Sequence, residues 1–203
     1  MSSANGLQAE IVQSRIERDC VNVEYPVVQG LPDRGVQAEI NQLILNTVNR
    51  MIPSEIQCET GGDFVSGTYR IRLNEQGLLS LTLFVQWFFF PMAHPAEEHT
   101  AITVDLATGR IYTFRDLFSG GSHYKLLIDR FIEGEIARRN IVTIAPYPGV
   151  NDYQDYYLTP DALVVFFPIY EFTPRPEGFP EFVIPYTFIR NRIDPEGPIA
   201  RLI

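Results

Sequence analysis

The spacing of apolar residues changes along this chain, and that change most constrains its fold. Apolar and polar residues alternate from Val21 to Val27, the period-two pattern of a half-buried strand. Pro26 predicts that this strand lies at a sheet edge or ends there. Apolar residues then recur every three or four positions from Val36 to Met51, which predicts a helix with Asp33 as its N-cap. The chain therefore begins with a strand followed by a helix.

Alternation returns after the first helix. It predicts strands over residues 65–73, 79–90 and 100–106. Ala107-Thr108-Gly109 then predicts a turn into a short hairpin strand at 111–114.

A second helix is expected after Gly120-Gly121, with Ser122 or His123 near its cap. Its apolar stripe consists of Leu127, Ile128, Phe131, Ile132 and Ile136. The last strands are expected over residues 156–158, 163–167 and 182–189.

Strands and helices do not alternate regularly in this order, which predicts an α+β fold rather than a βαβ architecture. We expect mainly antiparallel sheets with two principal helices packed on them. Four segments are predicted: an N-terminal tail over 1–14, a strand-helix-strand module over 15–92, a hairpin-helix-hairpin module over 93–190 and a C-terminal tail over 191–203.

The charge balance argues against nucleic-acid binding. The chain holds 25 acidic and 16 basic residues, a formal net charge of −9. Contact with phosphates needs a basic face, so we expect no nucleic-acid partner. Basic partners remain open.

No membrane segment is expected in this chain. Residues 1–6 lack the basic and apolar regions of a signal peptide. The longest apolar stretch, residues 78–93, carries Gln86 and Pro91 and is too short for a membrane helix.

The two cysteines, Cys20 and Cys58, have no companion ligands at metal spacing. Two unpaired thiols are favoured over one disulfide, and the pairing stays open.

Two histidines and two glutamates lie close together in the segment from His94 to His99. Zinc-binding helices carry their histidines three or four residues apart, whereas these are five apart and Pro95 intervenes. We interpret the segment as a turn with solvated charges and predict no metal, no cofactor and no catalytic residue. An alternative hypothesis is a cell-wall-associated hydrolase that uses His94 or His99 with a carboxylate.

Two loops have the composition of contact surfaces. Residues 147–157 are rich in tyrosine, which combines apolar area with a hydrogen-bonding tip, and residues 171–180 are stiffened by proline. Plain connection between strands is the alternative for both loops. The candidate partner-binding residues are Tyr147, Tyr153, Tyr156, Pro174, Arg175, Pro176 and Phe179.

Three stretches resemble an uncharacterised bacterial domain family. They are Ala93-His94-Pro95 followed by residues 103–118, then residues 156–167, and then residues 170–186 with Ile184-Pro185-Tyr186. This family forms the extracytoplasmic part of the sigma-V anti-sigma factor, which recognises lysozyme. The upstream region resembles the module that precedes certain peptidoglycan deacetylase domains.

The residues that carry the resemblance are interpreted as structural. Thr108-Gly109 is expected to form a turn with positive φ, and Asp116 is expected to accept backbone N–H bonds. The full set is His94, Asp105, Thr108, Gly109, Asp116, Phe118, Tyr157, Pro185 and Tyr186.

The resemblance implies a non-enzymatic, extracytoplasmic binding or sensor module. Its partner is expected to be a protein, including a basic muramidase such as lysozyme, or a cell-wall component such as peptidoglycan. The alternatives are the hydrolase, a deacetylase-accessory domain and a structural spacer without a ligand. Any targeting segment is expected outside this chain, and a cytoplasmic location stays open.

Overall fold

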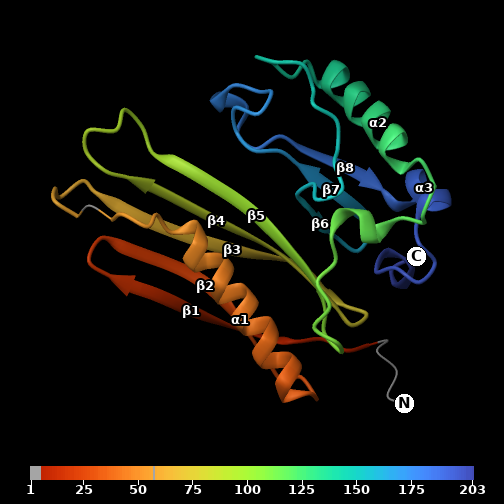
Figure 1. Ribbon diagram of the computed structural model, residues 1–203, viewed down its shortest axis with the longest axis horizontal. Helices are drawn as coiled ribbons and strands as arrows, with labels where there is room; N and C mark the ends of the chain where they lie inside the picture. Colours follow the sequence, from red (N-terminus) through yellow and green to blue (C-terminus); the bar gives the residue numbers. More distant parts are fainter. Residues whose placement is uncertain (1–5, 57) are drawn as a thin grey trace. The chain divides into compact units, whose positions relative to one another are not determined.

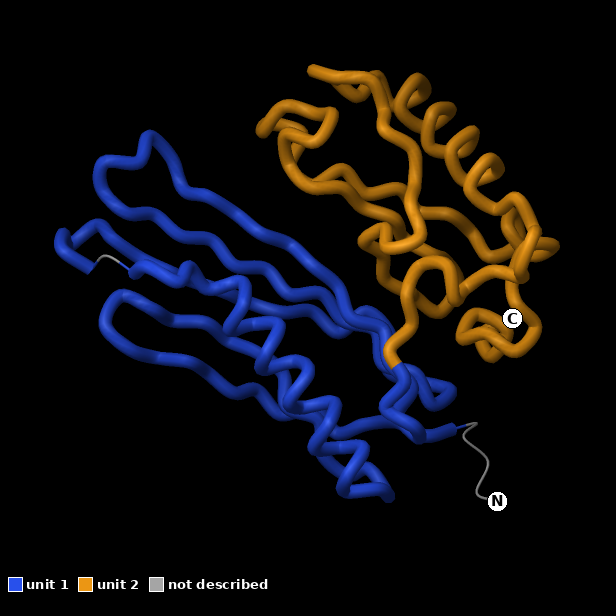
Figure 2. The backbone as a smooth tube through the Cα atoms, viewed as in Figure 1, with its two compact units in different colours: residues 1–110 blue, residues 111–203 orange. Residues whose placement is uncertain are grey.

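The computed structural model describes residues 6–56 and 58–203. The chain divides into two compact units, residues 1–110 and 111–203 (Figure 2). Among the described residues, no helix has the length and apolar character to cross a bilayer. The first five residues of the predicted tail, and most of the segment tested for a signal peptide, lie outside the described residues.

The first unit is a five-stranded sheet with one long helix across a face (Figure 1). The strand order follows the sequence: β1 (Glu10–Arg18), β2 (Val21–Gln29), β3 (Phe64–Glu75), β4 (Leu78–Phe88) and β5 (Ala96–Asp105). Neighbouring strands are antiparallel except β2 and β3, which are parallel. The helix α1 (Arg34–Met51) makes the crossover that a parallel pair requires.

Helix α1 begins where the sequence predicts. The Asp33 carboxylate accepts the backbone N–H groups of Gly35 and Val36 at 2.7 and 3.1 Å, which confirms it as the N-cap. The predicted apolar face is buried at Ile40, Ile44, Thr47, Val48 and Met51.

Strand β2 is not a sheet edge, because it lies between β1 and β3. Pro26 is tolerated because β2 pairs with β3 only over Val21–Val23. Beyond that point Asn41 of α1 takes the place of a strand: its amide bonds the N–H and C=O of Val28 at 2.7 and 2.9 Å.

Strand β1 occupies residues of which the first five were expected to belong to a tail. None of its nine residues is fully buried, which fits a sequence without clear apolar alternation. The strand forms because it pairs with β2 along its whole length, from Glu10 with Gln29 to Arg18 with Val21.

The second unit is a three-stranded antiparallel sheet with β7 (Ala162–Phe166) between β6 (Tyr156–Leu158) and β8 (Glu181–Pro185). Helix α2 (Tyr124–Arg139) contributes the buried side chains Ile128 and Ile132. The strand expected at 182–189 ends at Pro185, where the short helix α3 (Tyr186–Ile189) begins. The 3-10 turns are η1 (Phe114–Leu117), η2 (Arg175–Glu177), η3 (Arg190–Arg192) and η4 (Ile199–Arg201).

These elements confirm an α+β fold with mainly antiparallel sheets. The division between units falls after Arg110, later than the expected 92/93 boundary, because β5 pairs with β4 along its length. The hairpin strand expected at 111–114 is absent, since Phe114 begins η1. Residues 191–203 are not a loose tail, because Ile193 and Ile199 are buried.

Cys20 and Cys58 form a disulfide, which corrects the preference for unpaired thiols. Cys20 follows β1, and its carbonyl accepts the N–H of Val65 in β3 at 2.8 Å. The parallel pairing of β2 with β3 therefore brings the segment around Cys58 back to Cys20, although 38 positions separate them in sequence.

Candidate functional site: a tyrosine loop held on helix α2

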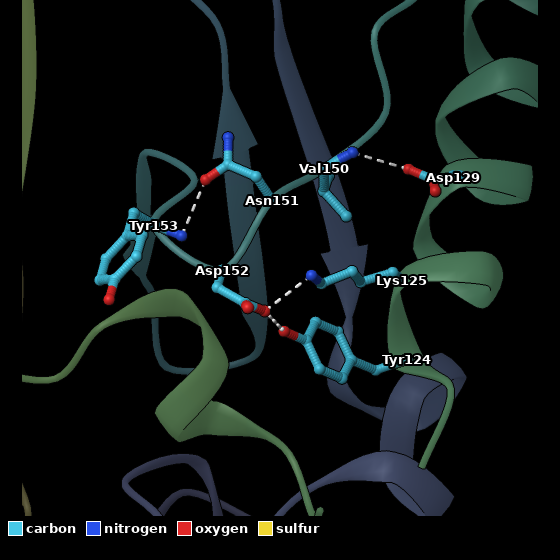
Figure 3. Close-up of polar contacts among 7 residues, drawn as sticks. All are labelled: Tyr124, Lys125, Asp129, Val150, Asn151, Asp152 and Tyr153. Atoms are coloured by element: carbon cyan, nitrogen blue, oxygen red, sulfur yellow. Dashed lines mark hydrogen bonds and ion pairs between the residues drawn. The ribbon is translucent and has the colours of Figure 1, made fainter. Parts of the chain in front are cut away.

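The candidate site is the segment of residues 147–155, which we call the tyrosine loop. Helix α2 ends at Asn140 in the left-handed conformation, with φ of 52°, and the N–H of Ile141 bonds the carbonyl of Ile136 at 3.1 Å. The chain then returns alongside α2 before it enters β6 (Figure 3). Two carboxylates fasten the returning loop to the helix.

The first fastening is Asp129 of α2. Its Oδ1 atom accepts both the Tyr147 hydroxyl at 3.0 Å and the Val150 N–H at 2.8 Å. Gly149 lies between them with φ of 80°, a left-handed conformation that glycine adopts without steric cost. The turn at Gly149 lets one helical side chain hold two points of the loop.

The second fastening is Asp152 of the loop itself. Its Oδ1 atom accepts the Tyr124 hydroxyl at 2.7 Å and lies 2.8 Å from Lys125 Nζ (Figure 3). The Lys125 ammonium and the Tyr124 hydroxyl hold the pKa of Asp152 below its usual value. Asp152 is therefore ionised at neutral pH.

Tyr153 stands immediately after this fastening and is 78% exposed. Its N–H donates to the Asn151 side chain at 2.8 Å, a local turn that fixes the backbone. On its other side, Gln154 is buried and its amide donates to the Phe166 carbonyl at 2.8 Å. An exposed aromatic ring thus projects from a backbone that is held on both sides.

The two anchoring tyrosines are hydrogen-bond donors. Burial, followed by the charge and hydrogen bond of Asp129, raises the pKa of Tyr147. Burial and then the hydrogen bond to Asp152 raise the pKa of Tyr124. Both hydroxyls stay protonated at neutral pH. What the arrangement offers a partner is the exposed ring and hydroxyl of Tyr153 on a backbone that is held in place.

The other two candidate tyrosines hold the unit together. Tyr147 packs edge-on against Phe167 and Phe172, each with a ring-centre distance of 5.6 Å. Tyr156 is only 6% exposed, and its hydroxyl donates to the Tyr112 carbonyl at 2.7 Å. We leave both out of the proposed contact surface.

The proline-rich segment 171–180 is likewise fastened from within. Phe172 is fully buried, and its carbonyl accepts the N–H of Ile144 at 2.9 Å. In η2, the Glu177 carboxylate accepts the N–H of Val142 at 3.3 Å, so this segment runs beside residues 142–145. Pro176 is exposed, whereas the candidates Pro174, Arg175 and Phe179 are half-buried.

The histidine cluster divides between two environments. His94 lies exposed before β5, and its Nδ1 is 3.1 Å from the Pro95 carbonyl. His99 lies within β5 against the edge of Phe84, and burial, assisted by Arg72 and Arg70, lowers its pKa to about 4. No group of three or more metal-ligating side chains gathers anywhere in residues 6–56 and 58–203.

Four of the residues that carry the family resemblance lie close to β5. One precedes the strand, and three lie at its end or in the turn that follows it. His94 is the exposed histidine described above. Asp105 is buried and accepts the N–H groups of Ala107 and Thr108, both at 2.9 Å. The Thr108 hydroxyl accepts the N–H of Arg110, and Gly109 has φ of 73°, the positive value expected for this turn.

The remaining resemblance residues lie in the second unit. Asp116 accepts the N–H and hydroxyl of Thr113 at 2.8 and 2.6 Å, and Phe118 stacks on Tyr124 with ring centres 4.1 Å apart. The Tyr157 hydroxyl donates to Glu181 at 3.1 Å. Tyr186 donates to the Thr159 carbonyl at 2.6 Å, and Pro185 ends β8.

Sequence reasoning missed the residues that hold the tyrosine loop. Lys125 and Asp129 are four residues apart and share one face of α2, which is the spacing of a helical ion pair. Lys125 instead binds Asp152, and Asp129 binds Tyr147 and Val150. The spacing could have drawn attention to this face, but only the path of the loop shows what it holds.

Part of this chain matches the profile of a known domain family. Residues 115–187 match the profile of DUF3298, described as a protein of unknown function. No curated protein matches the sequence.

Two solved structures of DUF3298 family proteins share the fold along nearly the whole length. One from Bacteroides fragilis has 14% identity and a TM-score of 0.74, and the match covers 99% of each chain. One from Pseudomonas aeruginosa has 13% identity and a TM-score of 0.70, covering 100% of this chain and 99% of the other. The chain is thus similar to DUF3298 proteins in sequence over residues 115–187 and in fold over its length.

Proposed function

We propose that this protein is a non-enzymatic, extracytoplasmic binding module that recognises a protein or a cell-wall component through Tyr153. The observation that carries the proposal is that Tyr153 is 78% exposed on a loop fastened to α2 at Asp129 and Asp152. A fixed loop loses little conformational freedom on binding, and tyrosine is among the residue types that dominate interface energies.

The disulfide supports the extracytoplasmic location. Cys20 and Cys58 are paired, and disulfides persist in oxidising compartments but are rare in the cytosol. The family resemblance points in the same direction, because the related domain of the anti-sigma factor lies outside the cytoplasm.

The formal net charge of −9 supports a basic protein partner such as a muramidase. An acidic surface accelerates encounter with a basic partner, and added salt screens that attraction. We expect association with lysozyme to slow as the salt concentration rises.

The test is binding of the protein to lysozyme and to purified peptidoglycan. We expect Tyr153→Ala to weaken binding to the recognised probe by about tenfold or more, the range of a contact hot spot. Phe90→Ala is the matched control, because Phe90 is an exposed aromatic residue of the other unit, 67% exposed, and its variant should bind like the wild type.

A second variant tests the fixed loop separately from the ring. Asp152→Ala keeps Tyr153 but removes the bonds to Tyr124 and Lys125. We expect binding to weaken about threefold to tenfold, because the loop is no longer preorganised. Most of this loss should appear as a slower association rate. Absence of binding to both probes, or a Tyr153→Ala variant that binds unchanged, overturns the proposal.

A further inference from the structure

Strand β1 lies at the edge of the five-stranded sheet, and its pairing with β2 fixes which of its backbone groups point away from the sheet (Figure 1). The hairpin from Arg18 to Val21 has two turn residues, so this closing pair exchanges hydrogen bonds, and such pairs alternate along an antiparallel ladder. At the intervening positions Val28 bonds Asn41 instead of β1, and Pro26 has no N–H to donate. The β1 residues opposite these intervening positions therefore direct their backbone groups outward.

Four residues of β1 have this orientation, and we call their N–H and C=O groups the open edge: Ile11, Gln13, Arg15 and Glu17. Within residues 6–56 and 58–203, none of these backbone groups has a hydrogen-bond partner. The open edge ends on one side at Ala9, whose N–H and C=O are held by the Asn74 side chain at 3.0 and 2.8 Å. On the other side the chain turns at Asp19, where φ is 47°.

The open edge lacks most of the features that prevent pairing at a sheet edge. Those features include short strands, lysines, prolines and bulges. Strand β1 has nine residues, contains neither lysine nor proline, and pairs with β2 without a break in register. Its two glutamates and two arginines cancel in charge, so they disfavour only a partner with the wrong order of charges.

Two registers of an antiparallel pair of β1 strands are unfavourable. Outward residues of one copy must face outward residues of the other, because only their backbone groups are open. A two-fold axis at Gln13 would place Glu17 opposite Ala9, whose backbone groups are occupied by Asn74. An axis at Arg15 would place two arginines directly opposite each other, and such like charges are destabilising.

An axis at Ser14 instead pairs every group of the open edge. Ile11 then faces Glu17 of the other copy, and Gln13 faces Arg15. Each of these facing pairs exchanges two hydrogen bonds, as in any antiparallel ladder. The backbone alone therefore favours one register.

The side chains of β1 match in the same register. Glu10 faces Arg18 of the other copy at each end, and both residues are exposed. Between the ends, Val12 faces Ile16. Ile16 lies beside the buried Val23 of β2, so this face of β1 continues the hydrophobic core. Val12 is 38% exposed, and Ile16 of the other copy would cover it.

We propose that two copies of this protein associate by antiparallel pairing of their β1 strands about a two-fold axis at Ser14. A second copy is the occupant because the strand from Glu10 to Arg18 is complementary to itself. It is acidic at one end and basic at the other, with apolar residues at matching places and a small serine on the axis. The contact lies within residues 1–110, whereas Tyr153 lies in the other unit, so the proposal does not depend on the proposed function.

The first test is sedimentation equilibrium of the wild-type protein. We expect the mass to rise with concentration from 23.2 kDa toward twice that value. A single mass of 23.2 kDa at all concentrations up to about 100 μM overturns the proposal. This result decides the proposal whether or not the variants below are stable.

Two charge reversals test the register. Glu10→Arg places like charges opposite Arg18, and Arg18→Glu places like charges opposite Glu10, so each variant alone should dimerise about tenfold more weakly. A mixture of the two variants has opposite charges at both ends of the pair and should associate about as tightly as the wild type. Glu133→Arg and Arg190→Glu are the matched controls, because they make the same charge changes at exposed positions of the other unit. A mixture that associates no more tightly than either variant alone contradicts the register and overturns the proposal.

Crosslinking locates the axis. Cys20 and Cys58 are paired, so Ser14→Cys introduces a free thiol where the described residues have none. Residues facing each other in a pair without hydrogen bonds have Cα atoms about 4.5 Å apart, within the range of a disulfide. Gln13→Cys is the control, because Gln13 is more exposed than Ser14 but faces Arg15 of the other copy.

We expect Ser14→Cys to form a covalent dimer at least about fivefold faster than Gln13→Cys. Random collision would instead favour the more exposed thiol of Gln13→Cys. Equal rates, or a faster reaction of Gln13→Cys, therefore overturn the proposal. Circular dichroism checks that both variants are folded.

Discussion

His99 couples protonation to folding at mildly acidic pH. Burial, with help from Arg72 and Arg70, lowers its pKa from 6.5 to about 4. Between these two values the unfolded chain binds a proton that the folded chain does not, so stability falls as the pH is lowered through this window. We expect His99 to account for about 2 to 3 kcal/mol of the stability lost between pH 7 and pH 4.5.

The measurement is urea unfolding at both pH values. His99→Gln should show a smaller loss than the wild type, and His94→Gln is the matched control because His94 is exposed. Carboxylates titrate in the same range, and the comparison between the two variants removes their contribution. An unchanged pH dependence in His99→Gln contradicts the prediction.

At the same scale, the five-residue spacing of His94 and His99 was sufficient to argue against a zinc-binding helix. The sequence could not show that His99 is half-buried and His94 exposed. Burial of His99 depends on the pairing of β5 with β4, which places His99 opposite Phe84. Tyr147 and Tyr156 were predicted as contact residues, and the sequence could not show that Tyr147 is half-buried and Tyr156 buried, because their partners Asp129 and Tyr112 are distant in sequence.

At the scale of elements, replacing glycine by alanine should change the free energy of unfolding in opposite directions at two positions. A Cβ atom on Gly67 in β3 would lie 2.7 Å from Val23 Cγ1 and 3.0 Å from the Phe84 carbonyl. Gly67→Ala should therefore lower the free energy of unfolding by about 1 to 3 kcal/mol through overpacking. Gly134 in α2 has no atom within 4 Å of such a Cβ, so Gly134→Ala should raise it by about 0.5 to 1 kcal/mol through helix propensity.

Both variants are measured by urea unfolding monitored with circular dichroism. Each serves as the control for the other, because the chemical change is identical. Two changes of the same sign would contradict the assignment of Gly67 to close packing between β2 and β3.

The fastening of the tyrosine loop is a property of helix α2. Asp129→Ala leaves the Val150 N–H and the Tyr147 hydroxyl without their partner, and Val150 is buried. We expect a loss of about 2 to 3 kcal/mol and faster amide exchange at Val150. Glu133→Ala, one turn later on the same helix and exposed, should change neither quantity.

Elements with a strong local signal were predictable, and the others depend on their neighbours. Asp33 and the apolar face up to Met51 specify α1 in the sequence alone. Strand β1 has no such signal because its stability comes from pairing with β2.

At the scale of the whole molecule, the α+β class follows from the order of strands and helices. The disulfide does not, because Cys20 and Cys58 meet only once α1 has carried the chain from β2 to β3. For the candidate site, an exposed tyrosine in a tyrosine-rich loop was predictable from the sequence. The carboxylates that hold this loop could be identified only from the path of the folded chain.

The disulfide closes a segment that contains β2 and α1, entirely within residues 1–110. Removing it frees this segment in the unfolded chain, which should lower the free energy of unfolding by about 2 to 4 kcal/mol. The comparison is between the wild type and Cys20→Ser/Cys58→Ser in urea unfolding, with reduced wild type as a second form.

The same variant tests whether the two units unfold separately. Local opening of the first unit should speed amide exchange in α1 and β2 while Val150 in the second unit stays protected by Asp129. Loss of protection at Val150 to the same extent would show that residues 1–110 and 111–203 unfold together. Separate unfolding would mean that the tyrosine loop keeps its geometry in a reducing environment, so that binding through Tyr153 survives reduction of the disulfide.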